Sequence, residues 1–288
     1  MIKVFKFGGA SVKDADGVKN LIRVLNETGN KDKLIVVSAM GKTTNALEVV
    51  VKDYLKTSRI PASLETVKDY HRQIIDELFH SDQAPVWFRT ENLFTELENF
   101  LEHNKSTQYD FVYDQIVSYG ELISTTIVSE YLNSQNIPAN WLDSRNLIKT
   151  DSTYRDAKVD WSKTQQLIQE QVDSKKLNIV QGFIASDPNN FTTTLGREGS
   201  DYSAAIMAYC LNAENVTIWK DVPGVLNADP RFFQKAQLLN KISYEEAIEL
   251  AFYGASVIHP KTLQPLQRKE IPLFVRSFLN PSEEGTAV

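Results

Sequence analysis

Four loops of this sequence combine small residues with charged ones, a combination suited to holding an anion. They run from Lys6 to Gly9, from Ser38 to Asn45, from Gly196 to Asp201 and from Lys220 to Arg231. Small residues let the backbone approach a phosphate, lysine and arginine neutralise its charge, and aspartates can hold Mg²⁺ through oxygen ligands. This chemistry indicates nucleotide-dependent phosphoryl transfer, and it leaves the acceptor unidentified.

The stretch 191–211 carries the clearest of these signals. It begins polar and rich in glycine, and it then changes to apolar residues at helical spacing. Ser200 is expected to be the N-cap of that helix, with Asp201 in its first turn. A strand expected over 177–184 precedes the loop, so backbone N–H groups and the positive end of the helix dipole would face it. Arg197 could add two parallel hydrogen bonds to a carboxylate or phosphate. The alternative is an ordinary connection with a surface arginine.

Two strand–loop–helix units position the first loops. The alternating residues 2–7 end at Gly8 and Gly9, the apolar run 34–38 ends in the loop 39–45, and a helical pattern follows each. Such units predict a parallel sheet with helices on its faces, and ligands bind beyond the carboxyl ends of its strands. Further strands are expected at 139–143, 177–184, 215–219 and 273–277.

The region 60–135 has no convincing strand and predicts an inserted layer of helices, the last over about 109–133. Gly120 lies inside that last pattern, where glycine costs about 1 kcal/mol relative to alanine. Close approach of a ligand or of a facing helix would explain it, and Glu121 would then point into the same space. A kinked helix with a solvated glutamate is the alternative.

The composition restricts the class of protein. The chain has 288 residues and a net charge of −6, which argues against a broad basic face for nucleic acid. Its single cysteine, Cys210, excludes an internal disulfide, and its histidines lack metal-ligand spacing. No apolar run approaches the ~18 residues of a membrane span, and no leader pattern precedes the first strand, so we expect a cytoplasmic protein. Gly41-Lys42-Thr43 is not a P-loop, because Val36 stands where that motif needs glycine.

Taken in order, the motifs resemble the aspartokinases of the amino acid kinase superfamily over nearly the whole chain. The shared motifs are KFGGASV at 6–12, SAMGKTTN at 38–45, SYGELIS at 118–124, QGFI at 181–184, TTLGREGSDYSAA at 193–205, KDVPGVLNADPR at 220–231 and ISYEEAIELAFYGASVIHPKTL at 242–263. The resemblance implies phosphorylation of the β-carboxylate of L-aspartate by ATP with Mg²⁺, giving 4-phospho-L-aspartate, the first step toward lysine, threonine and methionine.

The implied fold is a three-layer α/β/α sandwich around a mostly parallel sheet of about eight strands. The implied organisation is one catalytic domain over residues 1–279, with the helical insertion at about 60–135, and a tail at 280–288 that leads toward regulatory domains. Family members commonly continue into paired ACT domains, and this sequence ends at Val288 without them. We therefore expect no inhibition by lysine or threonine. Because family members commonly dimerise, a homodimer is left open.

The resemblance also assigns roles to individual residues. Catalytic roles fall to Lys6, which bridges the phosphates, and to Asp201, which organises the active-site lysine or the metal. The residues implied to hold aspartate are Thr44, Glu121, Arg197 and Ser200. Among them, Arg197 takes a carboxylate and Glu121 takes the ammonium. The residues implied to lie near the nucleotide are Gly8, Gly9, Ser11, Asp221 and Arg231. No residue is assigned as a metal ligand.

The sequence departs from the family pattern at several positions near these loops. Ala10 replaces a threonine, Glu198 replaces a glycine beside the anion loop, and Lys220 replaces a threonine. Leu226 stands for an aromatic residue often found near the base, and Ser256 for a lysine that contacts the nucleotide. Lys220 would compensate for the cation missing at Ser256, so we hypothesise that Lys220 contacts a nucleotide phosphate.

Two kinds of alternative are left open. The acceptor could be glutamate or N-acetylglutamate, which other members of the superfamily use, although the SYGELIS and GREGSDYSA segments favour aspartate. The departures could instead mark an inactive relative that binds nucleotide without turnover.

Overall fold

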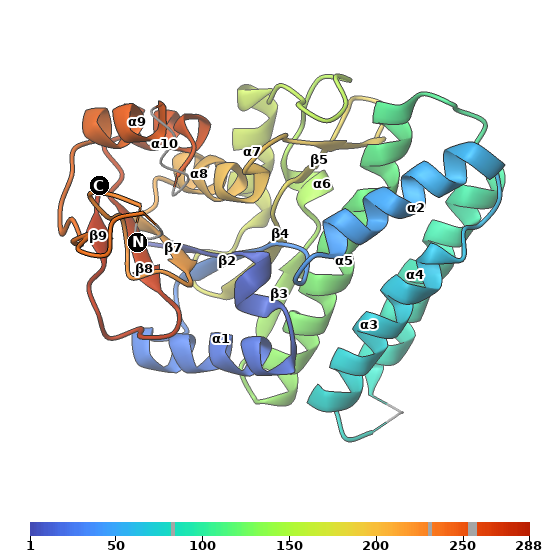
Figure 1. The fold of residues 1–288 in the computed structure, drawn as a ribbon, viewed down its shortest axis with the longest axis horizontal. Coiled ribbons are helices and arrows are strands. Elements are labelled where there is room, and N and C mark those ends of the chain that lie inside the picture. Colours follow the sequence, from blue (N-terminus) through green and yellow to red (C-terminus); the bar gives the residue numbers. More distant parts are fainter. Residues whose placement is uncertain (82–83, 230–231, 253–257) are drawn as a thin grey trace.

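A computed structural model describes residues 1–81, 84–229, 232–252 and 258–288. At its centre is a seven-stranded sheet with the order β3-β4-β2-β1-β7-β8-β9 (Figure 1). All neighbouring strands pair in parallel except β8 and β9, which are antiparallel. The strands are β1 (Lys3–Phe7), β2 (Lys33–Val37), β3 (Ala139–Leu142), β4 (Leu177–Gln181), β7 (Asn215–Lys220), β8 (Leu273–Ser277) and β9 (Thr286–Ala287).

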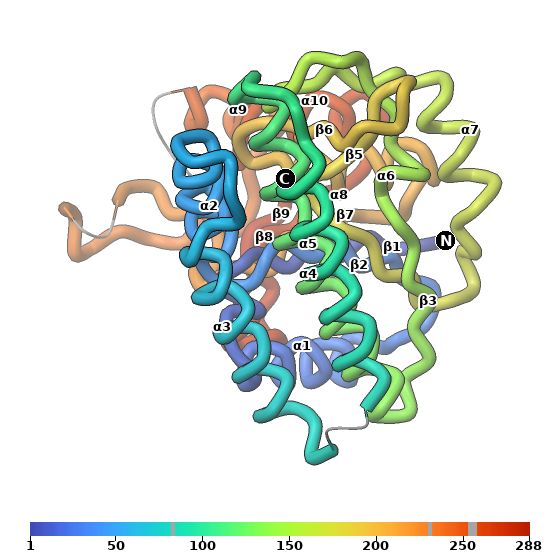
Figure 2. Tube along the Cα trace, turned by 90° about the vertical axis from the view of Figure 1, so that its right-hand side faces the viewer, coloured from blue at the N-terminus to red at the C-terminus, as the bar shows by residue number. Residues whose placement is uncertain are grey.

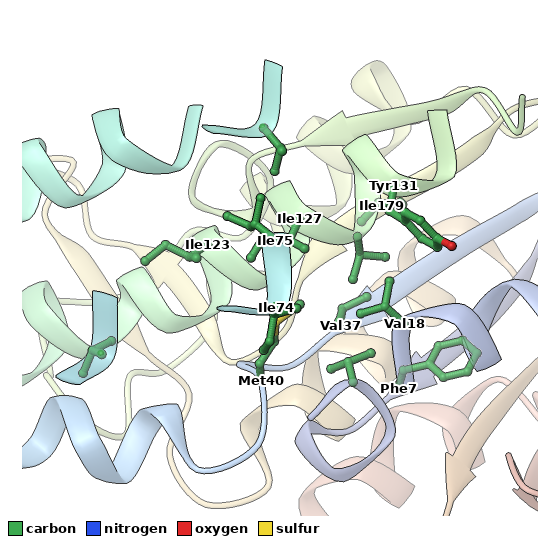
Figure 3. Close-up of a cluster of buried hydrophobic side chains, with 14 of the residues drawn as sticks. Phe7, Val18, Val37, Met40, Ile74, Ile75, Ile123, Ile127, Tyr131 and Ile179 are labelled. Atoms are coloured by element: carbon green, nitrogen blue, oxygen red, sulfur yellow. The ribbon is translucent and has the colours of Figure 1, made fainter. Parts of the chain in front are cut away.

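Helices cover both faces of this sheet, which confirms the predicted three-layer sandwich. Successive side chains of a strand point to opposite faces, so β1 contributes Phe5 and Phe7 to one core and Val4 to the other. The first core packs against α1 (Ala15–Thr28) and the inserted helices, and Figure 3 shows part of it around Phe7 and Val37. The second core packs against α6 (Ser144–Leu147), α7 (Trp161–Gln171), α8 (Gly199–Leu211), α9 (Tyr244–Phe252) and α10 (Pro260–Arg268).

Local sequence signals fix several of these elements. The Asp14 side chain caps α1 by accepting from the Gly17 N–H at 2.8 Å, and Gly29, at φ 82°, follows its last residue. The run Lys33–Val37 is buried throughout, as expected for a strand with helices on both faces. Among the described residues, every helix is too short or too polar to cross a bilayer.

The expected helical insertion consists of α3 (Ser63–Leu78), α4 (Pro85–His103) and α5 (Tyr109–Ser134), which pack with α2 (Thr43–Thr57). Figures 1 and 2 show these helices standing together at one side of the sheet. A Cβ on Gly120 would lie 3.0 Å from the Ala39 Cβ and 3.3 Å from the Thr43 Cγ2. The start of α2 and the loop before it therefore pack closely against α5 at this point, which leaves little room for a side chain at position 120.

The strand expected over 177–184 is shorter than the sequence predicts. β4 ends at Gln181, and Phe183 then adopts φ 69°, which turns the chain into the separate hairpin of β5 (Ile184–Ser186) and β6 (Thr192–Thr194). A Cβ on Gly182 would lie 2.5 Å from the Ser200 Cβ, so the start of α8 packs against this turn. The expected polar loop after residue 191 thus contains a short strand.

The expected cap of α8 is also wrong in detail. The helix begins at Gly199, so Ser200 lies within its first turn, and Glu198 occupies the N-cap position, where its side chain makes no capping hydrogen bond to the helix backbone. Glu198 has φ 54° and ψ 28°, a left-handed conformation in which glycine is least strained. This backbone would suit the glycine that the resemblance implies at this position.

The tail at 280–288, expected to be a linker, folds back onto the sheet. Gly285, at φ 70°, lets the chain turn, and β9 then pairs with β8 along what would otherwise be an open edge. Thr286 is fully buried, and its hydroxyl accepts from the Val225 N–H at 2.8 Å. The tail is therefore part of the folded unit, because its backbone groups pair with the sheet.

Candidate active site

A cavity of about 590 Å³ lies where β1, β2 and β4 end. Because these strands are parallel, the loops that follow them meet at one edge of the sheet, and the start of α8 and the middle of α5 close the walls. Seven of the residues assigned from the sequence line this one cavity: Lys6, Gly9, Thr44, Glu121, Arg197, Ser200 and Asp201.

A buried ion pair joins β1 to α8 in the cavity wall. The Lys6 Nζ lies 2.6 Å from the Asp201 Oδ1, and the Lys220 Nζ lies 3.8 Å from the Asp201 Oδ2. Burial by itself raises the pKa of Asp201, but the charges of Lys6 and Lys220 outweigh it and hold that pKa below its usual value. Asp201 is therefore a carboxylate at neutral pH, and it fixes the position of the Lys6 ammonium.

Glu121 is a second buried carboxyl group, contributed by α5. It is 2% exposed, and its Oε1 accepts from the Ala39 N–H at 3.2 Å. Its Oε2 has no hydrogen-bond partner within the described parts of the chain. Burial raises the pKa of Glu121 to about 8, despite the opposing effects of the Ala39 N–H and the Lys6 charge. A solvated glutamate on a kinked helix is therefore wrong, and the unpartnered oxygen suits a cationic ligand such as an ammonium.

The loop before α8 provides an anion-binding wall. Gly196, at φ 77°, turns the chain, and Gly199, Ser200 and Asp201 then form the first turn of α8 at the cavity. This arrangement presents the positive end of the helix dipole to the cavity. Arg197 is exposed to solvent and lies in the same wall, where its guanidinium can reach a bound anion.

Comparison with known proteins agrees with this geometry. The model of the amino acid kinase family matches residues 1–277, which is nearly the whole chain. The chain belongs to the amino acid kinase family. Among its relatives, lysine-sensitive aspartokinase 3 of Escherichia coli (strain K12) is 35% identical over 290 residues. A bifunctional aspartokinase/homoserine dehydrogenase 2, chloroplastic, of Arabidopsis thaliana is 34% identical over 299 residues.

This chain covers only part of the length of these relatives. The match takes in 100% of this chain but 64% of the Escherichia coli protein and 32% of the Arabidopsis protein. The crystal structure of E. coli aspartokinase III in complex with aspartate and ADP superposes with a TM-score of 0.87 at 34% identity. That superposition covers 100% of this chain and 64% of the other. The resemblance to aspartokinases seen in the motifs is thus confirmed over the full length of this chain.

Two of the glycines expected near the nucleotide have clear packing reasons in this structure. A Cβ on Gly8 would lie 3.2 Å from the Lys6 Nζ, so glycine leaves room for that ammonium. A Cβ on Gly9 would lie 2.8 Å from the backbone oxygens of both Ala39 and Gly41, so glycine lets the first two loops pack together. The absence of a side chain at these two glycines therefore lets the Lys6 ammonium and the loop after β2 take up their positions in the site.

The remaining nucleotide-side residues lie outside the cavity lining. Ser11 is buried, and its hydroxyl donates to the backbone oxygen of Trp219 at 3.4 Å. Asp221 is exposed directly after β7, and Lys220 contacts Asp201, which itself lines the cavity. Leu226 is half-buried, and its backbone pairs with that of Leu238 in a single antiparallel β-bridge. The predicted nucleotide residue Arg231 and the departure at Ser256 lie outside the described residues.

The cavity also contains residues to which the sequence assigned no individual role, among them Ser38 and Phe183, which lie in recognised motifs, and Tyr113 and Arg155, which do not. Tyr113 precedes Glu121 by eight residues on α5, so the helical period alone could have placed both on one face. Arg155 lies in a polar stretch without a recognised motif, and no sequence signal would have found it. Its backbone has φ 68°, a rare conformation for a residue with a side chain.

The described residues include no cluster of three or more His, Cys, Asp or Glu side chains arranged to hold a metal. Mg²⁺ usually binds through one or two carboxylates together with water and substrate phosphates. Asp201 is an ionised carboxylate in the wall of this cavity, and Glu198 lines the same wall, so the residues fit a magnesium ion that arrives with a nucleotide.

Proposed function

We propose that this chain transfers the terminal phosphoryl group of ATP to the β-carboxylate of L-aspartate, giving 4-phospho-L-aspartate and ADP. The observation that carries the proposal is the content of one cavity: the Lys6–Asp201 ion pair, Arg197 beside the start of α8, and the unpartnered oxygen of Glu121. L-Aspartate presents the complementary groups, two carboxylates and one ammonium. The relative solved in complex with aspartate and ADP supports this assignment.

The chemistry needs positioning more than proton transfer. The β-carboxylate of aspartate has a pKa near 4, so it is already an anion at neutral pH and needs no general base. The barrier comes from repulsion between this anion and the phosphates of ATP, and fixed positive groups lower it. Lys6 supplies such a charge, because Asp201 holds its ammonium at 2.6 Å and the cavity shields the pair from water.

The other groups hold the acceptor in place. Arg197 binds one carboxylate, with the first turn of α8 adding its dipole, and Thr44 and Ser200 lie in the same lining. Glu121 receives the substrate ammonium on its unpartnered oxygen. This contact requires ionised Glu121, so binding of the ammonium favours loss of the proton that burial retains.

The nucleotide approaches from the side of the loops after β1 and β7, where Gly8, Gly9, Ser11 and Asp221 are assigned to its binding. Arg231, which lies outside the described residues, is assigned to the nucleotide from the sequence alone. A magnesium ion carried by its phosphates would neutralise charge as the phosphoryl group transfers. Lys220 contacts a phosphate in this proposal. Its ammonium already lies near the cavity, 3.8 Å from Asp201, which places it within reach of a phosphate next to Lys6.

Glutamate is the main alternative acceptor, because it carries the same three charged groups on a chain one methylene longer. N-acetylglutamate is less suitable, because its amide cannot offer a cation to the buried carboxyl group of Glu121. The product, 4-phospho-L-aspartate, would feed the synthesis of lysine, threonine and methionine.

A coupled assay of ADP release tests the proposal. The purified chain is supplied with ATP and Mg²⁺ together with L-aspartate, L-glutamate, N-acetyl-L-glutamate or no acceptor. We expect release with aspartate well above each of the other three conditions. Faster ADP release with glutamate or N-acetylglutamate than with aspartate would show that this other compound, and not aspartate, is the acceptor. Nucleotide binding without release under any condition would support an inactive relative instead.

A further inference from the structure

We propose that Arg155 is a second cationic binding group for the acceptor, which works with Arg197 to hold one of its carboxylates. This inference rests on the proposed function and adds a substrate-binding residue to it. The two arginines come from segments forty-two residues apart in sequence, and both line the cavity that contains Glu121 and Lys6.

The backbone of Arg155 is the first observation behind the inference. Its φ of 68° lies in the left-handed region, which residues with a Cβ rarely occupy. Strained residues of this kind persist where the surrounding structure determines them, and they concentrate at ligand-binding sites. Glycine would satisfy this backbone without strain, so the arginine side chain is retained at some cost to the fold.

The second observation is the anchor that fixes this backbone. Asp114 on α5 is fully buried, and its Oδ2 accepts from the backbone N–H groups of Arg155 at 2.9 Å and Thr194 at 2.8 Å. Its Oδ1 accepts from the Thr194 hydroxyl at 2.8 Å. Thr194 lies three residues before Arg197, so one carboxyl group of α5 holds the segments that carry both arginines. Their relative positions are therefore set before a ligand arrives.

The third observation is how the side chain is held. The Arg155 guanidinium lies 4.5 Å from the centre of the Tyr113 ring and 5.5 Å from that of Tyr109. Stacking of this kind fixes the plane of the guanidinium while its edge remains able to donate hydrogen bonds. Tyr113 itself lines the cavity, so the stacked guanidinium lies at the cavity wall. The side chain is 45% exposed, which leaves it accessible to an incoming substrate.

A purely structural role is the competing explanation. The Arg155 Nη1 lies 3.5 Å from the Asp110 Oδ1 in the first turn of α5, and this pair could serve only to tie the segment to the helix. Both partners are substantially exposed, and exposed pairs of this kind contribute little to stability. Removing Asp110 and removing Arg155 should therefore have different consequences if the arginine binds substrate.

The test compares Arg155→Gly with Asp110→Asn and a matched arginine variant, Arg89→Ala. Arg155→Gly removes the cation and suits the backbone φ, so we expect a melting temperature within about 4 °C of the wild type. Asp110→Asn keeps the cation and removes the ion pair. Arg89 also stacks on an aromatic ring, Trp141, but it is absent from the cavity lining. The kcat and the KM values for aspartate and ATP are measured for all four proteins, and aspartate binding is measured by calorimetry.

For Arg155→Gly we expect the KM and the Kd for aspartate to rise about tenfold or more, as for loss of a charge-assisted hydrogen bond, with the KM for ATP unchanged. Asp110→Asn and Arg89→Ala should leave all these constants within about twofold. An unchanged KM for aspartate in an active Arg155→Gly enzyme would overturn this inference and leave the proposed function standing. So would an equal rise in the KM for ATP, or an Asp110→Asn enzyme with the same defect. A wild-type protein that neither binds nor phosphorylates aspartate would overturn the proposed function as well.

Discussion

Raising the pH from about 6 to about 8 should lower the KM for aspartate steeply, because Glu121 must lose its proton before it can pair with the substrate ammonium. Burial raises the pKa of Glu121 to about 8. At neutral pH only about one molecule in ten then has this carboxyl group ionised. If the neutral form cannot hold the ammonium, the apparent affinity at pH 7 is reduced about tenfold from its value at high pH.

The expected magnitude follows from the same pKa. Each pH unit below the pKa of Glu121 should raise the KM for aspartate about tenfold, which corresponds to about 1.4 kcal/mol of binding free energy. The slope should flatten near the pKa. Both carboxylates of aspartate are ionised throughout this range and add no dependence of their own. The measurement is the KM for aspartate from the ADP-release assay at several pH values, at saturating ATP.

Glu121→Gln is the matched control, because it keeps the shape of the side chain and removes its titration. Its KM should be high at every pH and nearly constant across the range. A wild-type KM that changes by less than about twofold between pH 6 and pH 8 would refute the reasoning. The same conclusion would follow if Glu121→Gln kept the wild-type slope.

The raised pKa of Glu121 also affects stability, and the sign can be worked out. Between the ordinary pKa of 4.5 and about 8, the folded protein holds a proton on Glu121 that the unfolded chain has lost. The free energy of unfolding should therefore fall as pH rises through this window. Glu121→Gln should lack this part of the decline, which denaturant unfolding at several pH values can measure.

Three further substitutions test separate parts of the site. Lys6→Ala should lower kcat by ~10²–10³, as for loss of one fixed electrostatic group, and unchanged turnover would remove the role assigned to it. Glu198→Gly should raise the melting temperature by about 2–4 °C, because glycine relieves the left-handed backbone at φ 54°; a lower melting temperature would contradict this explanation. Lys220→Thr should raise the KM for ATP about tenfold, with a smaller effect on that for aspartate, and a change confined to aspartate would exclude the phosphate contact.

Much of the site could be predicted because its residues lie in loops directly after strands. The patterns at 2–7 and 34–38 predict parallel strands, and parallel strands bring their following loops to one edge of a sheet. This rule places Lys6 and Thr44 beside each other without any knowledge of side-chain contacts. The motif at 193–205 adds the start of α8, and hence Arg197, to the same place.

Other features depend on partners on separate elements, which the local pattern of the chain does not reveal. The two residues of β9 have no periodicity, and they form a strand only because the edge of β8 lies open to them. Arg155 enters the cavity because the buried carboxyl group of Asp114, on another element, accepts from its backbone. Neither result can be read from the local sequence.

The sequence by itself determined the main parallel strands, the inserted helices and most of the charged groups of the candidate site, because apolar periodicity and glycine-rich loops are local properties of the chain. Only the tertiary structure decided the protonation of these groups. Glu121 and Asp201 are both buried carboxyls, yet burial raises the pKa of Glu121 while Lys6 and Lys220 hold that of Asp201 low. The difference arises because desolvation and nearby charge depend on which side chains the fold brings together.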